Sequence, residues 1–120
     1  SSDGGESWSP LTPQADLPDS GAMGSVIRYE LADGSDVLLH SGSTTRIKGR
    51  RSRGAVYASF DSGESWPLHK VYHPGSFDYS SIVRLPNGDI GILGEFDFGV
   101  NGKFNDIRFT RIKLDWLLSQ

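Results

Sequence analysis

The sequence predicts an all-β fold, and three observations carry this prediction. Fifteen glycines and six prolines interrupt the 120 residues, so turns are frequent. The apolar residues occur in short runs in which β-branched and aromatic side chains alternate with polar ones, as half-buried strands require. A segment of eight residues also recurs 58 positions later, and self-similarity at a fixed long period is typical of propellers and solenoids.

Each predicted element has a local reason. The segment 25–29 alternates in strand fashion, and Asp33-Gly34 then turns the chain into a second strand. Turn formers at 61–63 separate the third and fourth strands, and those at 86–89 close a hairpin between the fifth and sixth. A long loop is expected over 41–53. The predicted strands are 25–29, 37–40, 55–60, 68–72, 79–85, 90–96 and 107–112, and a short helix is predicted at 114–118.

Composition limits the class of function. At 36% hydrophobic and 11% aromatic the chain is apolar enough to fold, but it lacks the run of about 18 apolar residues that a transmembrane helix needs. A net charge of -3 argues against a general nucleic-acid binder. The chain has no cysteine, and His40, His69 and His73 have no partner at metal-ligand spacing, so no metal or cofactor is predicted.

Two copies of the pattern S-x-D-x-G-E-S-W, which we call the octets, lie at 1–8 and 59–66. In such a pattern the Asp accepts backbone N–H bonds within a tight turn, the Gly supplies positive φ, and the Trp packs under a neighbouring strand. Another pair of similar segments, 25–28 and 81–84, repeats after 56 residues. One four-stranded sheet for each such repeat has the size of a propeller blade. The predicted division is 1–20 as the end of one blade, 21–74 as a full blade and 75–120 as a last blade without its outer strand.

The octets resemble the Asp box, S/T-x-D-x-G-x-T/S-W, which occurs in sialidases and in several unrelated propellers. This resemblance implies a structural role, rather than a catalytic one, for Asp3, Trp8, Asp61 and Trp66.

Strand order brings candidate site residues to one end of the predicted sheets. Tyr79 and Glu95 flank the hairpin turn at nearly equal distances, so they are close to cross-strand neighbours at the end away from that turn. The loop at 41–53 opens on the same end, and both octets lie at the other. Arginines beside a Tyr and a Glu are suited to binding an anion. The alternative interpretation is a basic loop that is simply solvated. The sequence gives weaker support to a nucleic-acid site. The cationic run in this loop comprises Arg46, Lys48, Arg50, Arg51 and Arg53.

Longer segments resemble the C-terminal part of a sialidase. Residues 21–26 are similar to the family's G-C-Q-G-S-V strand opener, although Ala22-Met23 replaces Cys-Gln. The likeness runs through essentially the whole chain and implies a six-bladed β-propeller of which about two blades are present. The other segments that carry it are 49–57, 79–82 with 93–95, and 107–109 with 114–117.

The resemblance implies a role for each matching residue. Tyr79 matches the family's nucleophile, for which a phenol suits a substrate that carries its own carboxylate. Arg51 matches one of three arginines that hold this carboxylate, and Arg50 is the alternative if the register slips by one. Glu95 matches the carboxylate that orients another of those arginines. Gly94 stands where an aromatic is common. Phe96, Phe98 and Phe104 are candidates either for an aglycone surface or for buried packing.

The expected function is that of a C-terminal fragment of a retaining exo-α-sialidase. Its partners would be a sialylated glycan and the remaining blades of the parent chain, which would supply two further arginines, an Asp acid/base and a Glu that takes the Tyr proton. The fragment alone is expected to be inactive, and a secreted or periplasmic location is expected. The alternatives are a catalytically inactive, sialidase-like glycan-binding propeller, which Ala22-Met23 and Gly94 keep open, and an Asp-box propeller of another class.

Overall fold

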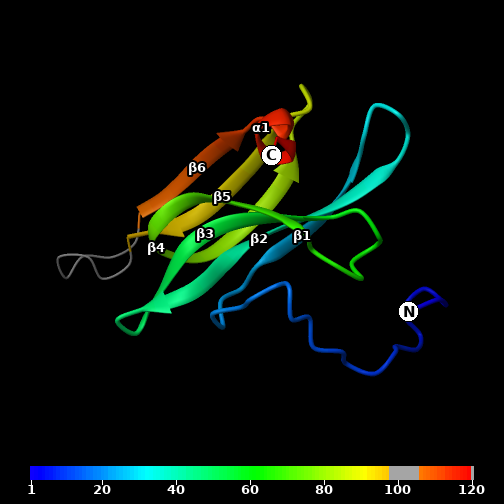
Figure 1. Ribbon diagram of the computed structural model, residues 1–120, viewed down its shortest axis with the longest axis horizontal. Helices are drawn as coiled ribbons and strands as arrows, with labels where there is room; N and C mark the ends of the chain where they lie inside the picture. The colour runs from blue at the N-terminus through cyan, green and yellow to red at the C-terminus, as the bar shows by residue number, and fades with distance from the viewer. Residues whose placement is uncertain (98–105, 120) are drawn as a thin grey trace.

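The chain folds into one antiparallel sheet that curls on itself, with a short helix at its end. The computed structural model describes residues 1–97 and 106–119. Within them the strands follow one another across the sheet in chain order, from β1 to β6 (Figure 1). The predicted all-β fold with a short C-terminal helix is confirmed. The elements are β1 Ser25–Glu30, β2 Asp36–Ile47, β3 Arg50–Ser59, β4 Leu68–Arg84, β5 Ile90–Phe96, β6 Asp106–Ile112 and α1 Leu114–Leu118.

The predicted loop at 41–53 is wrong, because these residues extend a hairpin. Strands β2 and β3 stay paired from Leu38↔Ser59 to Ile47↔Arg50, which leaves a connection of only two residues. Lys48 and Gly49 both have positive φ, 49° and 78°. This is the backbone of the two-residue turns whose twist matches that of paired strands. The hairpin carries the cationic run out along a ladder of hydrogen bonds instead of a loose loop.

The fourth and fifth predicted strands form one continuous strand, β4. Its first part, up to Ser76, pairs with β3, and its second part, from Phe77, pairs with β5. Pro74 and Gly75 lie between the two predicted strands. They fall where the pairing with β3 shifts register, and such an irregularity accommodates a residue that has no N–H to donate.

The main core lies between the two parts of the sheet that meet at β4. Side chains from β1, β2 and β3 pack there against side chains from the second part of β4, β5, β6 and α1. The hydroxyl of Tyr29 in β1 donates a hydrogen bond of 2.6 Å to the carbonyl of Gly88, in the turn between β4 and β5. Leu117 of α1 is fully buried in the same core. The two parts of the sheet are therefore held face to face.

A smaller cluster covers the other face of the first part of the sheet. Ala55, Tyr57 and Trp66 are buried there, and Leu17 of the N-terminal segment packs against them. Trp66 is 7% exposed, whereas Trp8 in the first octet is 77% exposed. The expected packing under a strand is thus observed for the tryptophan of the second octet. Within the described part of the chain, no helix has the length and apolarity needed to cross a membrane.

The two octets adopt the same hydrogen-bonded turn. In the second, Asp61 Oδ1 accepts hydrogen bonds from the Ser59 hydroxyl at 2.8 Å and the Ser65 amide at 2.9 Å, and Oδ2 accepts from the Ser65 hydroxyl at 2.6 Å. The Gly63 amide in turn donates to Ser59 Oγ. The corresponding residues of the first octet make the same bonds around Asp3. Both carboxylates therefore bind the backbone of their own turns.

These bonds predict a loss of stability in acid. Hydrogen bonds from the Ser65 hydroxyl, then its amide, and the Ser59 hydroxyl lower the pKa of Asp61 from 3.8 to about 2. Because the folded pKa lies below the unfolded one, the stabilisation is complete above about pH 4 and is lost as the pH falls to about 2. We expect urea denaturation to show a smaller pH dependence over this range in Asp61→Asn and in Ser65→Ala. An unchanged dependence in both variants would contradict this.

Candidate functional site

A β-bulge in β4 sets the position of Tyr79. Phe77 pairs with Phe96 and Ser80 pairs with Gly94, so Asp78 and Tyr79 together face the single residue Glu95. A bulge of this kind turns side chains away from the regular alternation and is common beside functional sites. The predicted proximity of Tyr79 and Glu95 is confirmed. The second octet lies at the opposite end of β3 from this bulge, also as predicted.

Tyr79 and Glu95 line the same groove. The groove has a volume of about 280 Å³ and opens on the face of the second part of the sheet. Tyr79 is 41% exposed, so its ring is accessible from this groove. Met23, from the segment before β1, forms part of the wall and is also exposed. The remaining lining residues are Ser80, Ser81, Leu93, Gly94 and Ile107.

Arg51 lies against Tyr79. Its guanidinium carbon is 5.2 Å from the centre of the Tyr79 ring, a cation–π distance. Its Nη1 is 3.1 Å from Oδ1 of Asp78. Hydrogen bonding to Tyr79, followed by Asp78, raises the pKa of Arg51 above its ordinary value. The guanidinium is therefore a permanent positive charge beside the phenol ring.

Arg50, the alternative to Arg51, lies elsewhere. It pairs with Ile47 at the end of the β2–β3 hairpin and is exposed. Neighbouring residues of a strand point to opposite faces, so Arg50 and Arg51 are directed to opposite sides of β3. Arg46, also in the cationic run, donates from Nε to the carbonyl of Ser20 at 3.1 Å. The cationic run is thus dispersed along the hairpin rather than gathered around Tyr79.

Sequence reasoning missed the contacts that hold Ser80, the residue after Tyr79, against β2 and the segment before β1. Ser80 Oγ lies 3.0 Å from Ser41 Oγ in β2, and Ser41 Oγ lies 3.3 Å from the hydroxyl of Tyr72. Burial raises the pKa of Tyr72, which keeps its phenol neutral. The Ser80 amide also donates to the carbonyl of Met23 at 3.1 Å. These bonds join strands that are distant in sequence, and no local pattern marks them.

Packing explains why a glycine, rather than an aromatic residue, stands at position 94. A β-carbon at this position would lie 2.8 Å from the ring of Phe77, which is fully buried. Phe77 therefore occupies the space that a larger residue at this position would need. Phe96 is 3% exposed and packs edge-on against Phe77, so it belongs to the interior rather than to an aglycone surface. Phe98 and Phe104 lie outside the described residues.

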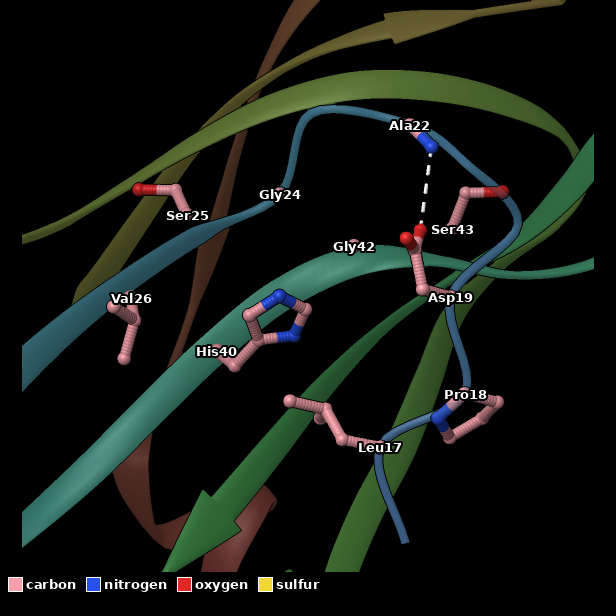
Figure 2. Close-up of a pocket in the computed structure, with 10 residues that line it drawn as sticks. All are labelled: Leu17, Pro18, Asp19, Ala22, Gly24, Ser25, Val26, His40, Gly42 and Ser43. Carbon is pink, nitrogen blue, oxygen red and sulfur yellow. Dashed lines mark hydrogen bonds between the residues drawn. The ribbon is translucent and has the colours of Figure 1, made fainter. Parts of the chain in front are cut away.

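A second cavity, of about 320 Å³, lies beside His40 (Figure 2). The imidazole points into it, and Asp19 stands opposite, accepting a hydrogen bond from the Ala22 amide. Burial lowers the pKa of His40, an effect that the charge of Asp19 opposes. Gly24 makes room for the ring, because a β-carbon there would lie 2.5 Å from Nε2. Over residues 1–97 and 106–119, no three His, Asp or Glu side chains gather in a metal-binding group.

Sequence comparison finds relatives among sialidases. A sialidase of Micromonospora viridifaciens is 38% identical over 122 residues, which cover 98% of this chain and 18% of that protein. An exo-alpha-sialidase of Aspergillus fumigatus is 32% identical over 123 residues, covering 95% of this chain and 30% of that protein. The chain thus spans less than a third of either curated relative. No family model matches it.

Structure comparison leads to the same class of protein. The crystal structure of an intramolecular trans-sialidase from Ruminococcus gnavus, in complex with oseltamivir carboxylate, matches the whole chain with a TM-score of 0.80 and 26% identity, over 28% of its own length. A leech intramolecular trans-sialidase complexed with 2,7-anhydro-Neu5Ac matches 96% of the chain with a TM-score of 0.77 and 25% identity, over 19% of its length. The resemblance to sialidases is confirmed, and the chain matches a part of each of these proteins in sequence or in fold.

Proposed function

We propose that the chain is part of a retaining exo-α-sialidase that removes terminal α-linked sialic acid from glycans. Tyr79 is the nucleophile and Arg51 binds the substrate carboxylate. Glu95 orients a second arginine, which the remaining blades of the parent chain supply. Those blades also supply the acid/base groups. The observation that carries the proposal is the arrangement of an accessible phenol, an adjacent guanidinium and a carboxylate at one bulge.

The chemistry of the substrate explains the choice of a phenol. Sialic acid has a carboxylate on its anomeric carbon, so an anionic carboxylate nucleophile would approach a like charge. The oxygen of Tyr79 bonds to that carbon as the glycosidic C–O bond breaks, while an acid protonates the departing oxygen and a base takes the phenolic proton. Water then cleaves the bond to Tyr79, so the released sugar retains its configuration. Arg51, charged throughout, holds the carboxylate beside the reacting carbon.

Arg51→Ala tests this assignment. In the full-length protein, acting on an aryl α-sialoside, we expect kcat/KM to fall about 10- to 100-fold, because one charge-assisted contact to the substrate is lost. Arg50→Ala is the matched variant one residue away and should have a smaller effect. A larger effect of Arg50→Ala would transfer the role to Arg50. Absence of any turnover by the full-length wild type would refute the hydrolase and favour a glycan-binding propeller.

The released product shows whether water or a hydroxyl of the sugar itself cleaves the bond to Tyr79 in the second step. The two solved structures described above are intramolecular trans-sialidases, and one of them is complexed with 2,7-anhydro-Neu5Ac. Release of a 2,7-anhydro product by the full-length protein would therefore assign internal transfer, and free sialic acid would assign hydrolysis. A glycan substrate outside cells also supports the proposal that the parent protein is secreted or periplasmic. The 120-residue chain alone is expected to be inactive.

A further inference from the structure

Asp78 is a buried carboxylate that the proposed reaction does not use. The residue is 7% exposed and immediately precedes Tyr79 in the bulge. Its Oδ1 lies 3.1 Å from Nη1 of Arg51, and the side chains of the two residues are 11% and 25% exposed. A buried carboxylate needs a charged or hydrogen-bonding partner, so this pair is held more firmly than an ion pair on the open surface.

The ion pair between Asp78 and Arg51 places the Arg51 guanidinium next to Tyr79. Asp78 and Tyr79 are neighbours in β4, while Arg51 reaches them from β3, across the pairing of Ser52 with Ser76. The contact with Asp78 uses Nη1, and the centre of the same guanidinium lies 5.2 Å from the Tyr79 ring. Because a guanidinium has five N–H donors, binding one carboxylate oxygen leaves donors for a second anion.

We infer that Asp78 is a positioning residue that holds the guanidinium of Arg51 over the ring of Tyr79. This inference rests on the proposed function for its catalytic consequence but not for its geometry. An arginine side chain loses much rotational freedom when it is fixed, and a buried carboxylate beside it offsets that loss. Without Asp78, the long side chain of Arg51 turns toward solvent, and a substrate carboxylate has to order it again on binding.

Proton NMR of the full-length protein, with its arginines isotopically labelled, tests the geometry directly. Protons of Arg51 that lie over an aromatic ring are shifted upfield, and Tyr79→Leu supplies the reference without the ring. We expect Asp78→Ala to move the Arg51 shifts to the Tyr79→Leu values. Asp78→Ser, whose hydroxyl is too short to reach the guanidinium, should do the same and replaces Asp78→Ala if that variant does not fold. Wild-type shifts in either folded variant would overturn the inference.

Asp89→Ala is the matched control. Asp89, in the turn before β5, pairs with Arg111 at 3.2 Å, and the two side chains are 15% and 62% exposed, so this variant removes another Asp–Arg pair whose carboxylate is mostly buried and whose arginine is more exposed than Arg51. Loss of the Arg51 shifts in Asp89→Ala as well would show a general loosening and would also overturn the inference. Asp78→Asn should retain the wild-type shifts, because the amide oxygen accepts the same hydrogen bond.

Kinetics of the full-length protein distinguish failure of the positioning role from failure of the proposed function. We expect kcat/KM for an aryl α-sialoside to fall about tenfold or more in Asp78→Ala and to be restored in Asp78→Asn, as for a contact that places a charged donor. If the shifts move but the wild-type protein has no turnover, the proposed function fails and the positioning stands. If turnover is present and Asp78→Ala matches the wild type, the positioning role in the reaction fails.

Discussion

Tyr79→Phe in the full-length protein is expected to reduce kcat for an aryl α-sialoside by about a thousandfold or more. Removal of one oxygen leaves the ring and its cation–π contact with Arg51 in place, but it removes the hydrogen bond between Arg51 and the phenol, and the bond to the anomeric carbon can no longer form. Loss of a nucleophile typically has effects of at least this size, and the residual rate comes from binding and the other groups. Steady-state kinetics together with trapping of a covalent intermediate measure the change.

The control for this substitution is Tyr29→Phe. The Tyr29 hydroxyl donates a hydrogen bond of 2.6 Å to the Gly88 carbonyl, and Tyr29 belongs to the main core rather than to the groove. Its removal is expected to lower stability by about 1 kcal/mol and to leave kcat unchanged. Equal turnover of Tyr79→Phe and the wild type would refute the nucleophile assignment. A covalent adduct on Glu95 would give the role to the carboxylate instead.

Phe77→Ala is expected to cause the largest loss of stability, about 3–5 kcal/mol. The ring is fully buried and lies edge-on to Tyr72 and Phe96, with centroid distances of 5.5 and 5.1 Å. It also fills the space left by Gly54 and Gly94, where added β-carbons would lie 2.8 Å from it. Truncation leaves a cavity at the point where β4 passes from one partner strand to the other. Urea denaturation of the full-length protein measures the effect.

The matched variant is Phe60→Ala, in the second octet. Phe60 is 53% exposed, so its truncation is expected to change the free energy of unfolding by about 0.5 kcal/mol or less. A loss below about 1 kcal/mol in Phe77→Ala would mean that the surrounding strands close over the gap. In that case the bulge that orients Tyr79 would depend on other contacts.

Local patterns predicted most of the fold. The octets form the expected turns because all their bonds lie within eight residues, and the hairpins follow turn chemistry at 33–34 and 86–89. The extent of the β2–β3 hairpin was missed because its end is polar and basic, and in this part of the chain cross-strand pairing outweighs composition. The continuity of β4 was missed because Pro74 and Gly75 indicate a turn unless a register shift accommodates them.

The site was predictable only in part. Tyr79 and Glu95 are nearly the same number of residues from the hairpin turn, and such residues face each other in antiparallel strands. Their proximity could therefore be predicted from the sequence. Asp78 could not be found in this way, because its partner Arg51 is 27 residues away and on another strand. The part-buried Ser41–Ser80 contact spans 39 residues and depends on how the sheet curls. The only local indication of the Asp78–Arg51 ion pair was that a carboxylate directly precedes the candidate nucleophile.

The unbroken course of β4 restricts how this segment can vary in length. Most neighbouring strands of the sheet are joined by surface turns, which tolerate an added residue. Between Ser76 and Tyr79 the chain passes from one partner strand to the other with no turn between them. A single residue inserted directly before Asp78 would move Asp78 and Tyr79 one position along β4 relative to Glu95. Asp78 would then take the position of Tyr79, and Tyr79 that of Ser80, whose hydroxyl contacts Ser41. An insertion that the hairpin turns accept would here move Tyr79 away from its place beside Arg51.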